Sequence, residues 1–330
     1  MRLLTQARSW ASMVVVGGAL GCAAGLVQAA PDYPNRPITL VVGFPPGGSN
    51  DIVARIIAPK LAAVLGTSVV VENRPGANAI IGTEYVARAK PDGYTLTLGS
   101  ASPLAISPHT YSKMPIDPLK DLVGVTTVAA TPEVVAVNPK VPANNLAELI
   151  ALSKTRQINV SSSGNGGLPH LAIELLRQAG AGGRISHVPY KGAGPAVVDT
   201  VGGHVEAVIM DLPAVYGMVQ EGRLRALATT NTQRAAVLPD LPTSVEQGYP
   251  GLLAFNWFAV MAPARTPAAI IERLHAALLE VVQAPEIRAQ MLKVGVEPYT
   301  QASPAQFARF MTEETRRWGE VARASGAKAD

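Results

Sequence analysis

From Arg36 onward the sequence repeats one pattern: a short run of β-branched residues, a turn rich in Gly or Pro, and an amphipathic stretch with the period of a helix. The first unit consists of residues 38–42 (ITLVV), the turn 43–50 (GFPPGGSN) and a helix predicted over 51–65. Strands that alternate with helices in this way predict parallel sheets with helices on their faces. The pattern therefore places the chain in the α/β class.

The length and the order of the predicted strands indicate two lobes. A chain of 330 residues is long for a single small core and short for three domains. Residues 125–137 are predicted to form two strands broken by Thr131-Pro132, where the chain first crosses between lobes, and a strand over 255–261 carries it back. We expect a mostly parallel sheet flanked by helices in each lobe, with lobe 1 formed by residues 31–131 and 254–330 and lobe 2 by residues 132–253.

Residues 1–29 have the pattern of a secretory signal peptide. Arg2 and Arg8 precede an uncharged apolar stretch at 10–26, and small residues lead from it to Pro31. Four glycines interrupt the apolar stretch, which disfavours a retained membrane anchor. We therefore expect export with cleavage near Ala29, and after residue 30 no apolar segment approaches the length of a membrane span.

The single cysteine, Cys22, lies inside this segment, so the mature protein is expected to have no thiol chemistry. An alternative interpretation is a lipoprotein in which Cys22 becomes the acylated N-terminus. Ala19 stands where such sequences usually have Leu, and the lipid anchor is therefore the less favoured interpretation.

The composition excludes two classes of protein. Apolar residues make up 48% of the chain, which is too high a share for a disordered segment. The 28 Lys and Arg and the 24 Asp and Glu are interspersed, giving a formal net charge of +4 and no basic run such as a nucleic-acid surface needs. Nucleic acid is therefore not an expected partner.

Three predicted strands run into glycine-rich turns that open helices, at residues 43–50, 163–169 and 190–195. Helix N-termini leave backbone N–H groups unpaired and carry the positive end of the helix dipole, so each turn is a potential anion site. Every α/β protein needs tight turns of this kind, and a single one has a purely structural explanation. The eight residues of 43–50 are more than a connection requires, and three such turns fit a ligand that carries carboxylates.

Patterns for nucleotide, catalytic and metal sites are missing. Gly43 and Gly48 have P-loop spacing, but Ser49-Asn50 follow where Lys-Ser/Thr is required, and neither G-x-G-x-x-G nor G-x-S-x-G occurs. The five histidines include no H-x-H or H-x-x-x-H pair. We therefore expect no catalytic residues, no cofactor and no metal.

Polar residues after other predicted elements are further candidates, each with a simpler alternative. Asp51 either stabilises the N-terminus of its own helix or orders the glycine-rich loop and meets a ligand amine. His170 either lies near a ligand or bonds backbone at a helix end. Lys191 either pairs with a carboxylate or is a solvated turn residue, and Asp211 either meets a ligand at the sheet edge or caps the next helix. Ser102 completes the loops expected at that edge.

Short motifs are spread over nearly all of the mature chain. In order, they are 33–38 (YPNRPI), 43–51 (GFPPGGSND), 71–76 (VENRPG), 91–96 (PDGYTL), 138–139 (NP), 162–166 (SSGNG), 187–192 (HVPYKG) and 262–264 (APA). Each motif alone is modest, but together and in this order they are highly specific. The chain resembles the periplasmic substrate-binding proteins of tripartite tricarboxylate transporters, the Bug/TctC family.

The resemblance implies a type II periplasmic binding protein, or Venus flytrap, that holds a small carboxylate-bearing or amino-acid-like solute between two lobes. It implies a periplasmic monomer that presents the solute to the membrane permease subunits of a tripartite tricarboxylate transporter. In the family, main-chain amides and bridging waters hold the ligand carboxylate. With the candidates above, the expected ligand-binding residues are Phe44, Gly48, Ser49, Asn50, Asp51, Ser102, Ser163, Gly164, Asn165, His170, Tyr190, Lys191, Gly192 and Asp211.

The chain departs from the family at 77–81 (ANAII), where relatives are richer in glycine, and at 167–169 (GLP), which is less polar. Because both changes bear on the distal side of the cleft, no particular solute follows from the resemblance. Three alternatives stay open: a ligand-sensing subunit of a membrane signalling system, a receptor without a transporter, and a secreted hydrolase using Asp51 or Asp211 with His170. The missing nucleophile motif disfavours the hydrolase.

Overall fold

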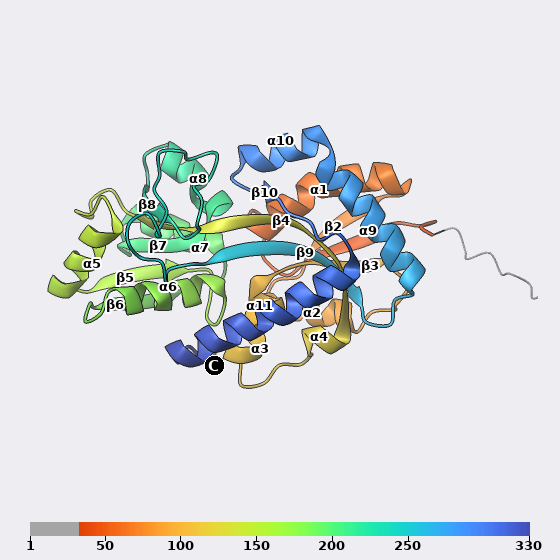
Figure 1. Cartoon of the computed structure of the whole chain (residues 1–330), viewed down its shortest axis with the longest axis horizontal. Helices are drawn as coiled ribbons and strands as arrows, with labels where there is room; N and C mark the ends of the chain where they lie inside the picture. Colours follow the sequence, from red (N-terminus) through yellow and green to blue (C-terminus); the bar gives the residue numbers. More distant parts are fainter. Residues whose placement is uncertain (1–32) are drawn as a thin grey trace, which may run out of the picture. The chain divides into compact units, whose positions relative to one another are not determined.

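The computed structural model describes residues 33–330, and within this part the strands form one mixed ten-stranded sheet (Figure 1). Along the sheet the strands follow the order β2-β1-β3-β9-β4-β7-β5-β6, while β10 and β8 pair with β4 off this path. The predicted signal peptide and Cys22 lie outside the described residues.

One half of the sheet carries the parallel strands that open the described chain. In this half β1 (Ile38–Val42) pairs in parallel with β2 (Val69–Asn73) and with β3 (Thr95–Ser100). Next to β3 lies β9 (Phe255–Pro263), which is antiparallel to it, and the short β10 (Glu297–Pro298) is antiparallel to β4. Because β1, β2 and β3 run parallel, their C-terminal ends lie at the same edge of the sheet.

The other half repeats this arrangement with a second set of parallel strands. Here β5 (Ile158–Ser162) pairs in parallel with β6 (Ile185–Pro189) and with β7 (Ala207–Asp211). Two antiparallel pairs complete this half, since β4 pairs with both β7 and β8 (Arg225–Thr229).

The strand β4 (Leu122–Val137) joins the two halves. Residues 125–137 therefore belong to a single strand, and the predicted break at Thr131-Pro132 is wrong. Residues 122–132 pair with β9, and residues 133–137 pair with β7 and β8. Pro132 lacks an N–H donor, but it stands at the last position paired with β9, where the neighbouring strand changes. The strand therefore continues through the proline.

The long strands β4 and β9 run antiparallel across the middle of the sheet (Figure 1). One carries the chain out of the first half and the other carries it back, so their directions are opposite. For this reason the sheet is mixed, and the expectation of mostly parallel sheets holds only for β1–β3 and β5–β7.

Helices lie on both faces of the sheet, with α1 and α9 on one side and α2 and α11 on the other (Figure 1). The helices of the first half are α1 (Ser49–Leu65), α2 (Ile80–Ala87), a π-helix η1 (Ser102–Ile106), α3 (Ser107–Thr110) and α4 (Pro118–Asp121). The second half has α5 (Leu146–Thr155), α6 (Leu168–Ala179), α7 (Ala193–Gly202) and α8 (Leu212–Gln220). The chain ends with α9 (Ala268–Gln283), α10 (Pro285–Lys293) and α11 (Pro304–Ser325).

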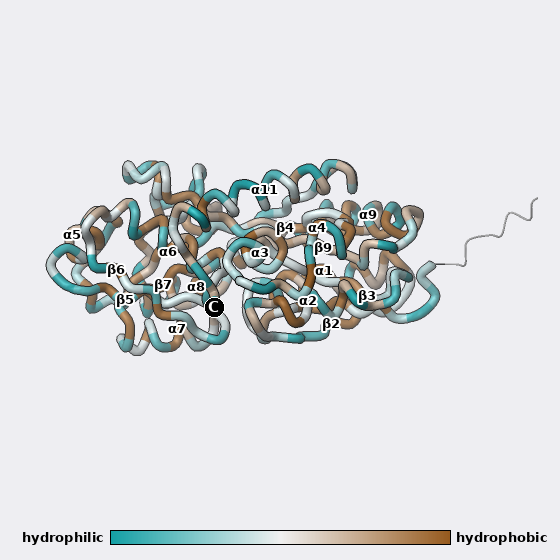
Figure 2. Tube along the Cα trace, turned by 90° about the horizontal axis from the view of Figure 1, so that it is seen from below, coloured by the Kyte–Doolittle hydropathy of each residue, from teal (hydrophilic) through white to brown (hydrophobic). Residues whose placement is uncertain are grey.

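Helix α11 is amphipathic, and hydrophilic and hydrophobic residues alternate along it (Figure 2). Its N-cap Ser303 accepts a hydrogen bond from the Gln306 N–H, and Gly326 ends it with a φ of 68°. Its buried residues recur at helical spacing: Phe307, Met311, Glu314, Trp318 and Ala322. They pack in the core together with Trp257 of β9. Among the described residues, no helix is long and apolar enough to cross a membrane.

Candidate functional site

Loops that follow the parallel strands of both halves line one small cavity, which we call the Asp211 cavity. Its volume is about 100 Å³. The loop after β1, the residues after β3 and the end of β7 all contribute to it, as does the start of α7. It includes eight of the expected site residues: Phe44, Gly48, Ser49, Asn50, Ser102, Ser163, Gly192 and Asp211. Among the lining residues only Asp211 carries a charge.

A second, larger cavity of about 640 Å³ shares part of this wall, and we call it the Lys191 cavity. Both cavities are lined by Phe44, Ser163 and Gly192, so they are neighbours. The Lys191 cavity adds the expected residues Gly164, Asn165, Tyr190 and Lys191. Among its lining residues Lys191 is the only charged one, so the two cavities differ in the sign of their charge.

Helices α1 and α7 both begin at the Asp211 cavity. Their N-cap residues are Gly48 and Gly192, and neither helix is capped by a side-chain hydrogen bond. The first backbone hydrogen bond of α1 runs from the Ile52 N–H to the Gly48 carbonyl at 3.0 Å. The amides before it have no intrahelical partner, because the first turn of a helix leaves its N–H groups unpaired. Two helix N-termini therefore direct amides and positive dipole ends toward one cavity.

The glycine-rich loop before α1 is held by Asp51, whose carboxylate is buried. One oxygen accepts from the Gly47 N–H at 3.0 Å and from Arg55 Nε at 2.9 Å, and the other accepts from Asn73 Nδ2 at 2.9 Å. Asn73 Nδ2 also donates to the Phe44 carbonyl at 3.1 Å. Burial raises the pKa of Asp51, but these hydrogen bonds outweigh it and hold the pKa below its usual value. The side chain thus orders the loop and lines neither cavity.

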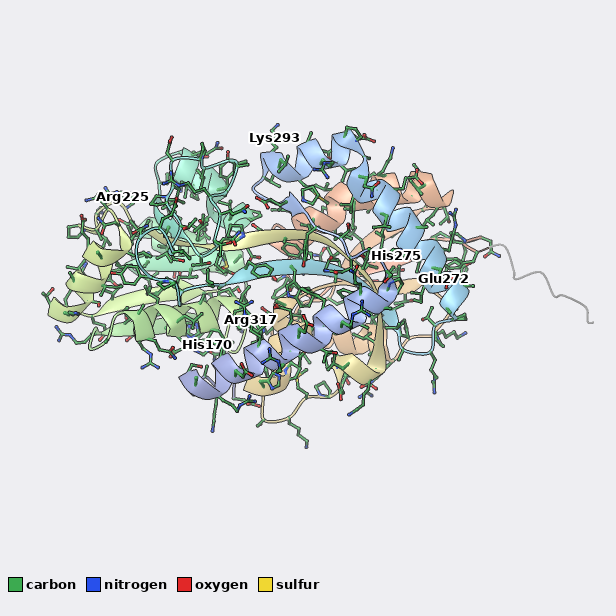
Figure 3. The ribbon with its side chains drawn as sticks, viewed as in Figure 1. His170, Arg225, Glu272, His275, Lys293 and Arg317 are labelled. Atoms are coloured by element: carbon green, nitrogen blue, oxygen red, sulfur yellow. The ribbon has the colours of Figure 1, made fainter. Side chains whose placement is uncertain are left out.

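The loop after β5 is supported by a buried pair of histidines. His170 on α6 (Figure 3) stacks on His187 with ring centroids 3.9 Å apart, and its Nδ1 accepts from the Gly166 N–H at 3.0 Å. His187 Nε2 lies 2.5 Å from the Ser162 hydroxyl. Burial lowers the pKa of both histidines, that of His187 to about 3, so both rings are neutral at pH 7. The loop at Ser163 and Gly164 therefore rests on an uncharged support, and His170 lines neither cavity.

Hydrogen bonds join the loops of the two halves. The Leu168 N–H donates to Ser102 Oγ at 2.9 Å, and Thr110 Oγ1 donates to the Gly166 carbonyl at 2.8 Å. A Cβ built on Gly192 would lie 3.2 Å from Pro45 Cγ, which shows how closely the loops before α7 and α1 approach. The two halves of the sheet therefore meet at the walls of both cavities.

Asp211 faces a second carboxyl group, Glu133, its register partner on β4. Both oxygens of Asp211 accept from Asn256 Nδ2, at 3.2 and 3.0 Å, while Asn256 Oδ1 accepts from the Ala101 N–H at 3.2 Å. Burial is the main cause that raises the pKa of Asp211, and it raises the pKa of Glu133 well above the usual value, with the charge of Asp211 adding to the effect.

Sequence reasoning missed several residues of this arrangement. Ser100 and Asn256 line the Asp211 cavity and Asn78 lines the Lys191 cavity, while Glu133 lies behind Asp211. Glu133 had a visible signal, because it is the only charged residue within the apolar run 125–137. Asn256 had none, since its role depends on how β9 returns beside β3.

The described residues contain no group of three or more His, Cys, Asp and Glu arranged to hold a metal ion. The hydrolase alternative needs His170 next to Asp51 or Asp211. The hydrogen bonds of these side chains run elsewhere: His170 to Gly166, Asp51 to the loop, and Asp211 to Asn256. His170, Asp51 and Asp211 therefore have separate hydrogen-bond partners in the described part of the chain, which disfavours the hydrolase alternative.

Comparison with known proteins identifies the family of this chain. The family model described as "Tripartite tricarboxylate transporter family receptor" matches residues 53–327. Protein BugT of Bordetella pertussis is 43% identical over 302 residues, which cover 91% of this chain and 92% of that protein.

Solved structures agree with the sequence match. The structure titled "R. palustris Rpa4515 with adipate" is 34% identical, has a TM-score of 0.86 and covers 90% of this chain and 99% of its own. MatC of Rhodopseudomonas palustris with bound malate is 29% identical, with a TM-score of 0.82 and coverage of 88% and 99%. The periplasmic binding protein BugD is 32% identical, with a TM-score of 0.84 and coverage of 90% and 99%.

These matches confirm the resemblance seen in the motifs and the predicted class of a two-lobed α/β periplasmic binding protein. The alignments extend over nearly all of the described chain rather than over one lobe. The chain belongs to the tripartite tricarboxylate transporter receptor family, which includes the Bug proteins.

Proposed function

We propose that this receptor captures a small carboxylate-bearing solute between its lobes and presents it to the permease subunits of a tripartite tricarboxylate transporter. The observation that carries the proposal is that α1 and α7 begin, without side-chain caps, at one cavity between the two halves of the sheet. Relatives with adipate and with malate in their structures support carboxylates as the ligand class.

The amides at the start of α1 and α7 bind the carboxylate in this proposal, and the residues lining the two cavities form the rest of the site. Ser49, Ser102 and Ser163 supply hydroxyl groups. Lys191 supplies a positive charge in the wall of the Lys191 cavity. Asp51 and His170 act behind the site by holding their loops. The proposed lining residues are Phe44, Gly48, Ser49, Asn50, Ser102, Ser163, Gly164, Asn165, Tyr190, Lys191, Gly192 and Asp211.

The lobes proposed for this mechanism are residues 31–131 with 254–330, and residues 132–253. The change of partner strand along β4, from β9 to β7 and β8, supports a boundary at residue 132. A ligand that touches both lobes binds the closed form more tightly and shifts the equilibrium toward it. The closed form is then the one that a permease recognises.

The same proposal places the mature receptor in the periplasm as a monomer, with cleavage near Ala29 and without a lipid at Cys22. The pattern of residues 1–29 and the periplasmic relatives support this location. The alternative of a sensor subunit uses the same closure to engage a signalling protein, and permease genes beside the receptor gene would favour transport over sensing.

Heat unfolding in the presence of mono-, di- and tricarboxylates and amino acids tests the proposal. A true ligand at a hundred times its Kd adds about 2.7 kcal/mol of stability and raises Tm. In Ser163→Asp a negative charge enters the wall that both cavities share, and the rise in Tm is expected to disappear. Thr232→Asp adds the same charge at an exposed position and keeps the rise. If no compound of the screen raises Tm, the proposal is contradicted.

A further inference from the structure

Residues 327–330, which we call the 327–330 segment, follow α11 and reach the Lys191 cavity. Helix α11 ends at Gly326, where a φ of 68° turns the chain out of the helix. Beyond this turn Ala329 lines the Lys191 cavity together with Tyr111, the residue after α3. Figure 1 shows this end of the chain beside α3. A segment far from the glycine-rich turns in the sequence therefore forms part of the wall of the site region.

Hydrogen bonds fasten the segment to the first half of the sheet. The carboxylate of Asp330 accepts from the Ser112 N–H at 2.8 Å with one oxygen and from Ser112 Oγ at 2.9 Å with the other. The Ala329 N–H donates to the Thr110 carbonyl at 2.9 Å. The hydrogen bonds from Ser112 lower the pKa of Asp330, so its carboxylate is ionised at pH 7. Three hydrogen bonds thus fix the position of two consecutive residues.

The segment also lies against the second half. A Cβ built on Gly166 would be 2.6 Å from Ala329 Cβ and 2.7 Å from Thr110 Oγ1, so a side chain at position 166 would collide with both. Thr110 Oγ1 donates to the Gly166 carbonyl at 2.8 Å. Helix α11 itself contacts α3 of the first half and α6 of the second. The segment therefore lies at the seam where the loop before α6 meets the end of α3.

The position of this wall bears on the size of the solute. In the proposed function a carboxylate binds to the amides of α1 and α7 at the Asp211 cavity, and the rest of a longer solute extends into the adjoining Lys191 cavity of about 640 Å³. Ala329 and Tyr111 line the Lys191 cavity and not the Asp211 cavity. They therefore border the part that holds the far end of the solute, and packed protein walls resist an oversized group.

We infer that the 327–330 segment is a wall of the Lys191 cavity that limits the length of the solute. This inference rests on the proposed function and names a specificity determinant of the same site. Ala329 forms the wall, and Asp330 is a positioning residue that holds it through Ser112. Deletion of the segment removes Lys328 and Asp330 together, so the net side-chain charge stays the same and the expected effect is steric.

The size limit can be measured without any solute. Cys22 is the only cysteine of the sequence, so Cys22→Ser combined with Ser163→Cys places one thiol in the wall that both cavities share. The rate of its reaction with bulky fluorescein maleimide is compared with the rate for the small reagent methyl methanethiosulfonate. Deletion of residues 327–330 is expected to raise this ratio of rates severalfold.

Two point variants accompany the deletion. Asp330→Ala releases the segment from Ser112 and is expected to raise the ratio in the same direction, and because Asp330 is exposed the variant leaves the core intact. Lys328→Ala is the matched control, an exposed residue of the same segment that lines neither cavity, and it should keep the wild-type ratio.

Titration calorimetry with succinate, adipate and suberate extends the test to solutes that differ only in length. Deletion of the segment is expected to shift the ratio of the Kd values for succinate and suberate about tenfold in favour of suberate, which corresponds to about 1.4 kcal/mol. The three diacids carry the same charge, so a ratio of their Kd values reports room in the cavity rather than electrostatics. Lys328→Ala should keep the wild-type ratio here as well.

The outcomes separate this inference from the proposed function. A ratio of thiol rates that the deletion and Asp330→Ala leave unchanged overturns the inference, whether or not a diacid binds. Diacids that bind with the same ratio of Kd values in the wild type and the deletion variant also overturn it and leave the proposed function standing. Changed thiol rates without binding of any diacid support the wall and count against the proposed function alone.

Discussion

At the scale of single residues, the site region contains buried carboxyl groups whose pKa values shift in opposite directions. Asp51 is buried, ionised and surrounded by donors, so it fastens a loop. Glu133 is fully buried, no donor of the described residues reaches its oxygens, and burial raises its pKa well above the usual value. Burial raises the pKa of both groups, but at Asp51 the hydrogen bonds outweigh it, so the pKa is lowered there and raised at Glu133.

Replacement of Asp51 by Asn is expected to destabilise the protein by about 1 to 3 kcal/mol at pH 7, because hydrogen bonds to a charged acceptor are lost. The folded state lowers the pKa of Asp51 below its usual 3.8. Its contribution to stability is therefore complete above that pH and is lost as the pH falls through the lower folded value. Denaturant unfolding of both proteins from pH 7 to pH 3 measures this.

The difference between wild type and Asp51→Asn should shrink in acid, while the exposed control Asp240→Asn should match the wild type throughout. A difference that stays constant down to pH 3 means that the ionised carboxylate is not what holds the loop.

The sequence predicts the position of Asp51 in the site region but not the pairing of Glu133 with Asp211. The motif GFPPGGSND points to a ligand loop and leaves two interpretations of Asp51 open, and the structure shows the loop-ordering contacts. The pairing of Glu133 with Asp211 joins residues 78 positions apart, and only the register of β4 with β7 brings them together. No local pattern contains that register.

At the scale of elements, helix and strand positions follow closely from hydrophobic period and turn residues. The strand predicted over 38–42 is found as β1, the helix over 51–65 as α1 and the strand over 255–261 as β9, each within two residues at each end. The break predicted in β4 was wrong, because a proline usually ends a strand but is tolerated where the partner strand changes. Neither the π-helix η1 nor the directions of β4 and β9 followed from local sequence.

Helix α11 is fastened to the sheet by a buried acid, which gives a test at this scale. Glu314 Oε2 accepts from Trp257 Nε1 at 2.8 Å and from Trp318 Nε1 at 3.1 Å, and both indoles are fully buried. Arg317 Nη1 lies 3.3 Å from the other oxygen, and Figure 3 shows Arg317 on this helix. Glu314→Ala leaves both indole N–H groups without an acceptor and opens a cavity.

The expected cost of Glu314→Ala is about 2 to 5 kcal/mol in the free energy of unfolding. Glu320→Ala is the matched control, because it removes an exposed ion pair with Arg316 on the same helix and is expected to cost about 1 kcal/mol or less. Denaturant unfolding compares the two variants. A loss no greater in Glu314→Ala than in Glu320→Ala contradicts the role of Glu314.

At the scale of the whole molecule, two halves of one sheet bring their loops together around two cavities of opposite charge. Two strands, β4 and β9, join the halves through antiparallel pairing. This pairing holds the two halves in register with one another. The chain belongs to a receptor family, and the uncapped N-termini of α1 and α7 at the Asp211 cavity support our proposal that main-chain amides bind the ligand.

The amide signals of the first turns of α1 and α7, measured by NMR during titration with the tightest carboxylate of the heat-unfolding screen, test this claim most directly. The amide protons of Ser49, Asn50, Ala193 and Gly194 are expected to move downfield as hydrogen bonds to the carboxylate form. Those of Ala268 and Ala269, in the exposed first turn of α9, should stay in place. If ligand saturates the protein and the α1 and α7 amides shift no more than those of α9, the carboxylate is not held there.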